Sequence, residues 1–141
     1  MKNYPKSVKE TAGGLAYLPR MIDKIRLQAD GRLGADYQEN FGKPRSGDGL
    51  CCNLLRVDHA VLAERVRAGG SDEEILEWCY ATGRRLNEGD VRVWNGFISK
   101  LGWNDFATLS LEESKQKAGL ADRADILTIP DLLDLEEGRI S

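Results

Sequence analysis

Two serines, each followed three residues later by a glutamate, constrain the fold of this chain more than any other feature. Ser71 precedes Glu74, and Ser110 precedes Glu113. In this arrangement the serine hydroxyl accepts the backbone N–H of the glutamate, and the glutamate carboxylate accepts the backbone N–H of the serine. Because only the first turn of a helix leaves such groups free, each pair predicts the start of a helix.

Apolar side chains spaced three and four residues apart predict further helices. The most regular run follows the capping residue Asn87 and consists of Val91, Trp94, Ile98 and Leu101. Other helices are indicated by a capping side chain or a proline at the start and by a glycine at the end. The predicted helices run from near Pro19 to Gly31, from Asp58 to about Ala68, from Ser71 to Thr82, from Asn87 to Gly102, from Ser110 to Ala118, and from Pro130, behind Thr128, onward.

Three stretches lack this periodicity. Residues 1–17 contain a proline and two glycines and predict an extended N-terminal arm. Residues 31–49 predict a long irregular loop, in which Tyr37 and Phe41 indicate one short helical turn. The apolar run over residues 50–57 fits a buried strand and a helix equally well, because periodicity does not distinguish them over so short a run.

These patterns predict a mainly α-helical fold. We expect residues 1–141 to form a single compact domain of five or six helices, with at most one short strand pair. A chain of 141 residues buries roughly 68–70% of the surface of its unfolded form, which is enough for a core without disulfides or structural metals. The 41% of hydrophobic and 30% of charged residues exclude the disordered and collagen-like classes.

The charge is small overall and unevenly distributed. The formal net charge is −3. Residues 1–34 carry seven basic and three acidic side chains, a net charge of +4, whereas residues 101–141 carry four and nine, a net charge of −5. A net acidic chain without a nucleic-acid-binding motif argues against nucleic acid as its partner.

The cellular compartment is predicted from the absence of membrane-spanning and signal-peptide patterns. No apolar window approaches the roughly 20 residues of a membrane span, and no signal-peptide pattern is present near the N-terminus. We therefore expect a cytoplasmic protein with no membrane partner, in which the three cysteines are reduced thiols.

The cysteines and the single histidine match no known metal-binding or catalytic spacing. Cys51 and Cys52 are adjacent, and Cys79 is isolated on a predicted helix. A zinc site normally offers pairs separated by two to four residues, so we expect no metal and no cofactor. His59 lies in the first turn of its predicted helix, where the helix dipole favours a neutral imidazole that is available as a base or a metal ligand.

Four segments of the sequence are similar to those of a known family. They are residues 4–7, 14–26, 34–38 and 94–103, of which the second and the last are the most specific. They resemble a bacterial family known only as domain of unknown function family 5069, over most of residues 4–105. The resemblance implies a bacterial source and a small stand-alone protein. It implies no activity and assigns no functional residues.

The polar side of the first predicted helix is one candidate ligand site. Arg20 and Lys24 are one turn apart, and Asp23 and Arg26 lie beside them. Two cations with a neighbouring carboxylate are suited to holding a phosphate or carboxylate. The same pattern is also typical of a solvated helix face with ion pairs three and four residues apart.

The polar side of the helix after Asn87 is the second candidate. It carries Arg92, Asn95 and Ser99 in one row, with Gly96 and Lys100 adjacent. Asn and Gly together cost about 1–1.5 kcal/mol in a helix interior relative to Ala, which calls for a reason. We expect Gly96 to permit the close approach of another helix or a ligand, and Asn95 to bind backbone groups or a substrate.

These observations give two functional hypotheses. The first is a binding or interaction protein whose ligand is an anionic small molecule or a protein partner. The second is a small enzyme in which Asp23, His59 or a cysteine in the same cleft acts as the acid, base or nucleophile. The oligomeric state and any reaction type stay open. The predicted ligand-binding residues are Arg20, Asp23, Lys24, Arg92, Asn95 and Lys100.

Overall fold

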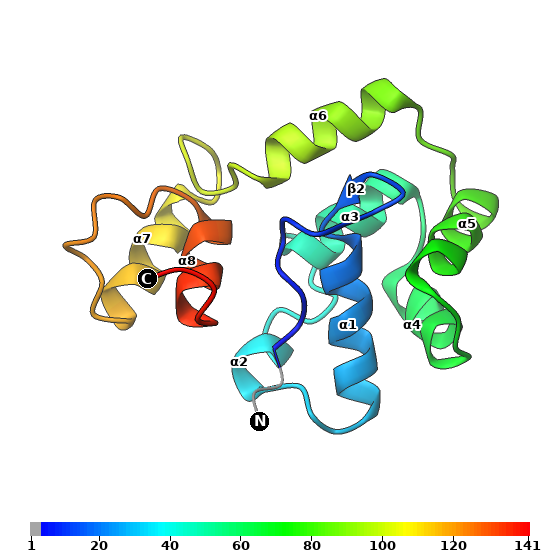
Figure 1. The fold of residues 1–141 in the computed structure, drawn as a ribbon, viewed down its shortest axis with the longest axis horizontal. Helices are drawn as coiled ribbons and strands as arrows, with labels where there is room; N and C mark the ends of the chain where they lie inside the picture. The colour runs from blue at the N-terminus through cyan, green and yellow to red at the C-terminus, as the bar shows by residue number, and fades with distance from the viewer. Residues whose placement is uncertain (1–3) are drawn as a thin grey trace.

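A computed structural model describes residues 4–141 and shows a mainly helical chain (Figure 1). Within these residues there are eight helices and one two-stranded antiparallel sheet, in which Thr11 pairs with Ala16. The prediction of five or six helices was therefore too low, although the mainly α class is confirmed. The elements are β1 (Thr11–Ala12), β2 (Leu15–Ala16), α1 (Leu18–Ala29), α2 (Ala35–Gln38), α3 (Gly47–Leu55), α4 (His59–Arg67), α5 (Asp72–Thr82), α6 (Glu88–Ile98), α7 (Thr108–Lys117) and α8 (Ile129–Glu136).

The predicted capping residues start four of the helices. The side chains of Asp58, Ser71, Asn87 and Thr128 each accept a hydrogen bond from a backbone N–H in the first turn of the following helix. Ser71 and Glu74 form the reciprocal pair that the sequence predicts. These four helix starts are local properties of the sequence, since each cap needs only its own side chain and three following residues.

The start of α7 differs from the prediction. The helix begins at Thr108 behind Ala107, so Ser110 lies inside the first turn and does not cap it. The hydroxyl of Thr108 instead accepts the N–H of Asp105. The Asp105 carboxylate also accepts the N–H of Gly102, so a hydrogen-bonded turn between α6 and α7 determines where α7 begins.

Helix α3 occupies a region that the sequence left undecided. It begins inside the predicted loop, at Gly47, where the Ser46 side chain accepts the N–H of Gly49. A Cβ at Gly49 would lie 2.2 Å from the carbonyl oxygen of Lys43, so the close approach of the preceding loop requires glycine. Residues 50–55 are therefore helical, and the glycines of α3 serve packing rather than loop flexibility.

The predicted N-terminal arm packs against the helices. Its residues 1–3 lie outside the described part of the chain. Beyond them the segment forms the β1–β2 hairpin, and Val8, Ala12 and Leu15 are buried in the main core. Burial of these side chains explains why the hairpin is ordered although each strand has only two residues.

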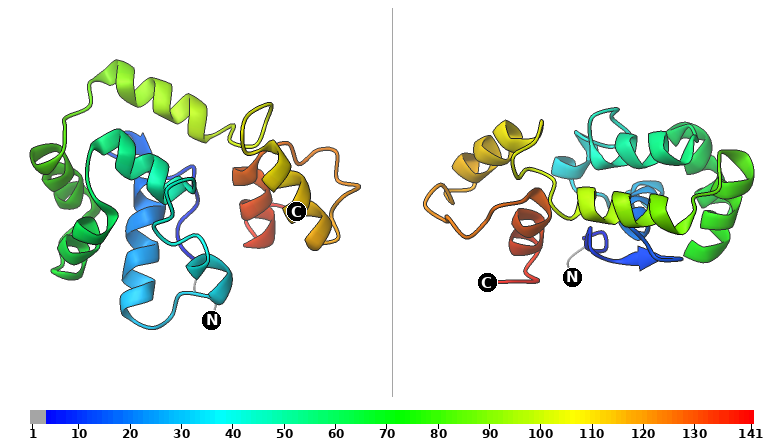
Figure 2. Two further views of the ribbon diagram at one scale, coloured as in Figure 1. Left: turned by 180° about the vertical axis from the view of Figure 1, so that it is seen from behind. Right: turned by 90° about the horizontal axis from the view of Figure 1, so that it is seen from above.

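Helix α1 lies in the middle of the molecule (Figures 1 and 2). Helices α4 and α5 flank it on one side, and α7 and α8 lie on the other. The main hydrophobic cluster surrounds Leu18, Met21 and Ile25 of α1. A second cluster of buried side chains, Leu111, Ile126 and Leu132, belongs to the α7–α8 region. The single-domain organisation stays a prediction.

No helix within residues 4–141 is both long enough and apolar enough to cross a lipid bilayer.

Candidate functional site

Arg20 and Lys24 of α1 are buried. This burial excludes the alternative interpretation of the sequence, in which they belong to a solvated helix face. Their residues are 2% and 4% exposed. They lie on the same side of the helix because four residues make about one turn. Each cation contacts a carboxylate that is also buried: Glu137 for Arg20 and Asp48 for Lys24. The sequence predicts that this pair of cations holds a phosphate or carboxylate ligand, and this stays a prediction. The carboxylates that the two cations contact in the structure belong to the chain itself.

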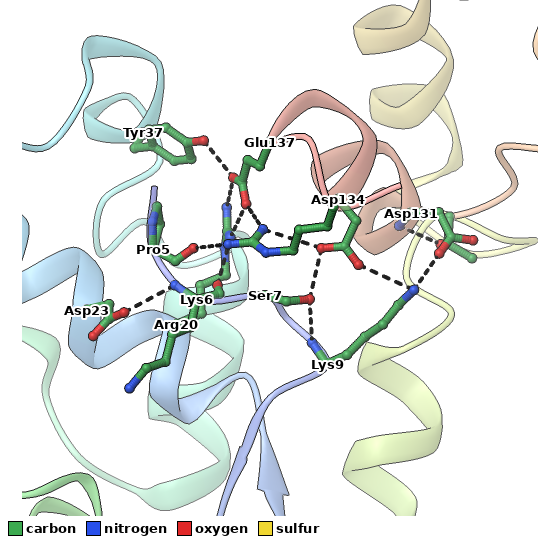
Figure 3. Close-up of polar contacts among 12 residues, drawn as sticks. Pro5, Lys6, Ser7, Lys9, Arg20, Asp23, Tyr37, Asp131, Asp134 and Glu137 are labelled. Atoms are coloured by element: carbon green, nitrogen blue, oxygen red, sulfur yellow. Dashed lines mark hydrogen bonds and ion pairs between the residues drawn. The ribbon is translucent and has the colours of Figure 1, made fainter. Parts of the chain in front are cut away.

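The Glu137 cluster, which comprises Arg20, Tyr37, Glu137 and Arg139, is centred on one carboxylate (Figure 3). Arg20 donates to both oxygens, over 3.1 and 2.9 Å, and the Tyr37 hydroxyl donates over 2.6 Å. Arg139 donates to the same carboxylate. Burial raises the pKa of Glu137, but the hydrogen bonds and charge of Arg20, together with the hydrogen bonds from Tyr37 and Arg139, outweigh it and hold that pKa below its usual range.

Beside this cluster, the N-terminal segment is joined to α8 by further polar contacts (Figure 3). The hydroxyl of Ser7 donates to buried Asp134 over 2.8 Å. The ammonium group of Lys9 pairs with Asp131 and Asp134 over 2.8 and 3.4 Å. Arg139 also donates to the carbonyl of Pro5. The contact between α8 and the N-terminal segment is thus largely charged.

The Asp48 cluster comprises Tyr17, Lys24, Asp48 and His59, and it contacts α1 through Lys24, one turn after Arg20, and through Tyr17, which directly precedes the helix. Asp48 is fully buried and accepts hydrogen bonds from the Tyr17 hydroxyl over 2.8 Å and from Lys24 over 2.9 Å. The backbone N–H of Gly42 donates to it over 3.0 Å. Burial lowers the pKa of Lys24 although Asp48 opposes the shift, and burial with the nearby Asp48 charge raises that of Tyr17.

His59 contributes the one buried side-chain nitrogen or oxygen in the described residues that has no hydrogen-bond partner. This atom is Nε2, and it lies 3.8 Å from a carboxylate oxygen of Asp48. Its ring packs edge-on against Phe41 and lies so close to Gly42 that a Cβ there would meet it at 2.7 Å. Burial lowers the pKa of His59, so the imidazole is neutral near pH 7, as the sequence predicts.

The polar residues of α6 do not join these clusters. Asn95 accepts the N–H of Ala16 over 2.9 Å and donates to the carbonyl of Gly14 over 2.8 Å, so it attaches α6 to the β1–β2 hairpin. Arg92 is exposed and pairs with Glu88 one turn away. Asn95 thus binds backbone groups, one of the two roles expected for it.

The remaining candidates are also placed by the structure. Asp23 accepts the N–H of Lys6 and pairs with Arg26. Lys100 is exposed just beyond α6. A Cβ at Gly96 would meet no atom within 4 Å, so the expected close approach of a helix at this glycine is wrong. The six predicted site residues therefore lie apart: two are buried on one face of α1, and Arg92 and Lys100 are on the surface.

The three cysteines are buried in the main core. Burial raises the pKa of Cys52 and of Cys79 to about 12 each, and that of Cys51 well above its ordinary value. A thiol with so high a pKa is protonated near pH 7 and is a poor nucleophile. Within residues 4–141 no group of three His, Cys, Asp or Glu side chains is arranged to hold a metal ion.

A groove at the surface of the α7–α8 region was missed by the sequence analysis. It has a volume of about 310 Å³. Trp103 and Leu127 line it and are about half exposed, while Leu111 and Ile126 belong to the second cluster beneath. Glu112 contributes a charged group to its wall. Trp103 is an apolar residue in a loop, but the sequence alone does not show that Leu127, 24 positions later, lies beside it.

The comparisons with known proteins add one finding. A search of curated proteins finds no match to this chain. The model of the family described as "Domain of unknown function (DUF5069)" matches residues 2–139. Since this match spans nearly all of the 141 residues, the chain belongs to the DUF5069 family.

Proposed function

We propose that this protein is an interaction protein that binds a segment of a partner protein in the groove beside α7. The observation that carries the proposal is the pair Trp103 and Leu127, which are 52% and 53% exposed on the wall of that groove. Large apolar side chains that flank a concave surface favour binding of an apolar anchor. A tryptophan in such a place is the residue type most often responsible for binding energy.

The walls of the groove are already held in place within the chain. The ammonium group of Lys115 is buried and donates to the carbonyls of Arg123 and Ile126 over 2.7 and 3.1 Å. These two hydrogen bonds fix the loop that carries Leu127 to α7. A preformed groove loses little conformational freedom when a partner binds, and this supports recognition by a short segment.

Charge favours a basic partner segment. Of the four basic residues in 101–141, Lys115, Arg123 and Arg139 are engaged in contacts within the chain. Glu112 on the groove wall and Glu113 beside it are exposed. We therefore propose an amphipathic segment in which an apolar side chain inserts between the groove walls and a lysine or arginine pairs with Glu112.

A peptide-binding experiment tests this proposal. The probe is a synthetic helical peptide of about 14 residues with leucine on one face and lysine on the other, and its counterpart has glutamate in place of every lysine. Binding is measured by isothermal titration calorimetry. We expect the lysine peptide to bind and the glutamate peptide to bind at least about tenfold more weakly.

Matched variants locate the binding site. Trp103→Ala should weaken binding of the lysine peptide by about tenfold or more, and Glu112→Lys should weaken it several-fold. Leu109→Ala is the control, because Leu109 is 76% exposed on the same helix and does not line the groove. Equal binding of both peptides, or an equal effect of Leu109→Ala, contradicts the proposal. So does a dimer of the free protein that Trp103→Ala dissociates in sedimentation experiments, because the occupant is then a second copy.

A further inference from the structure

The Arg20 side chain is oriented by groups that do not belong to α8. Its guanidinium donates to the carbonyl of Lys6 over 3.0 Å. The same group stacks over the ring of Tyr37, 5.6 Å from the ring centre. Both terminal nitrogens of Arg20 also donate to the Glu137 carboxylate. An arginine fork held in this way is pre-organised for bidentate binding of any carboxylate.

One carboxylate receives donors from three separate segments. Arg20 comes from α1, Tyr37 from α2, and Arg139 from the segment after α8. The side chains of Arg20 and Glu137 are 3% and 1% exposed. Proteins use such a convergence of arginine and hydroxyl donors to recognise the carboxylate of a ligand. Of the three donors, Arg20 and Tyr37 belong to helices other than α8.

Helix α8 contacts the N-terminal segment through polar groups and the main core through only a few partly buried side chains. Lys9, which is half exposed, pairs with Asp131 and with buried Asp134, and only the Lys9–Asp131 pair is exposed enough for salt to screen it strongly. Leu132 is buried in the second cluster, with α7. Ile129 and Leu133 contact the main cluster and are only partly buried. Movement of α8 would therefore leave most of the main core closed.

We propose that Arg20 and Tyr37 form a carboxylate-binding site that Glu137 fills as an internal ligand, and that the carboxylate of a small organic acid replaces Glu137 when α8 moves away. This site is distinct from the groove of the proposed function and takes a different class of ligand. A buried arginine without a counter-ion is strongly unfavourable. An external acid that takes the place of Glu137 avoids that state.

Two variants with the same charge separate binding from nonspecific effects. Glu137→Ala empties the site, whereas Glu137→Gln fills it with a neutral side chain of the same shape. The thermal unfolding temperature is measured with increasing acetate, against sodium chloride at equal ionic strength. We expect acetate to raise the unfolding temperature of Glu137→Ala in a concentration-dependent manner and to leave Glu137→Gln at its value in chloride. Adding Arg20→Met to Glu137→Ala should abolish the rise.

The wild-type protein tests whether Glu137 is displaced. Hydrogen exchange of residues 129–137 is followed by mass spectrometry in acetate and in chloride of equal ionic strength. We expect faster exchange of α8 in acetate, with residues 59–67 of α4 unchanged as the internal control. No acceleration at any acetate concentration overturns the proposal, because Glu137 is then a permanent part of the fold. The same conclusion follows if acetate stabilises both Glu137 variants equally. If Glu137→Ala does not fold, the exchange measurement on the wild-type protein alone decides the outcome.

Discussion

Replacing Asp48 by asparagine removes one buried charge and almost nothing else. Asparagine has the same shape, and its oxygen can accept from Lys24 and Gly42 while its nitrogen donates to the Tyr17 hydroxyl. The Lys24 ammonium is then a buried cation without its counter-ion. Breaking a buried pair in this way costs about 3–5 kcal/mol, a large share of the roughly 5–15 kcal/mol by which proteins of this size are stable.

Urea unfolding at pH 7, followed by circular dichroism, measures this cost. With a denaturant slope of about 2 kcal/mol per molar, a loss of about 4 kcal/mol lowers the midpoint by about 2 M. The variant should regain stability relative to wild type as the pH rises toward 10. Burial lowers the pKa of Lys24 in the folded state, so the unfolded chain binds more protons in that range and rising pH favours folding.

A double variant provides the decisive comparison. Combining Asp48→Asn with Lys24→Met removes both charges, so the double variant should be more stable than the sum of the two single losses predicts, by about 2–3 kcal/mol. Losses that add, or a cost below about 1 kcal/mol for Asp48→Asn alone, refute the view that the Asp48 charge serves to neutralise Lys24.

Three further predictions concern His59, the three cysteines and Asn95. Because burial lowers the pKa of His59, its neutral form stabilises the fold above about pH 6.5 and this contribution is lost as the pH falls; urea unfolding should show a smaller loss between pH 7 and 5 for His59→Gln than for wild type. Cys51, Cys52 and Cys79 should react with a disulfide reagent in absorbance assays only as fast as the protein unfolds, since all three are buried. Asn95→Ala should lower the unfolding free energy by about 1–3 kcal/mol in urea, because the Ala16 N–H and the Gly14 carbonyl both lose a partner.

The helix starts that the sequence predicts correctly are those that depend on neighbouring residues. The caps at Asp58, Ser71, Asn87 and Thr128 each involve a side chain and a backbone group three residues away. The sequence left residues 50–57 undecided between strand and helix and placed the start of α3 in a loop, because Gly47 and Gly49 resemble a loop in sequence. Their role becomes visible only with the partners that they touch: Gly47 lies against the Tyr17 ring, 30 positions earlier.

In the candidate site, too, only the arrangement of residues that are close in sequence could be predicted. The sequence places Arg20 and Lys24 one turn apart on one helix and predicts a phosphate or carboxylate ligand for them. Their partners Glu137 and Asp48 lie 117 and 24 positions away, and no local pattern connects them. The grouping of Arg92 and Lys100 with these cations was not observed, since helical periodicity defines one face of a helix but not what that face meets.

The separation of Arg20 from Glu137 has a consequence for the order of folding. The entropy of closing a loop grows with its length, so joining positions 117 apart costs about 1.4 kcal/mol more than joining the 24 that separate Lys24 from Asp48. Contacts between residues far apart in sequence form late in folding, unless earlier contacts have already shortened the loop that must close. During synthesis, Arg20 emerges from the ribosome long before residue 137 and lacks the Glu137 carboxylate until α8 arrives. Docking of α8 is therefore the step at which this guanidinium acquires its buried counter-ion, and slowing that step would leave a nascent chain with an unneutralised arginine on its central helix.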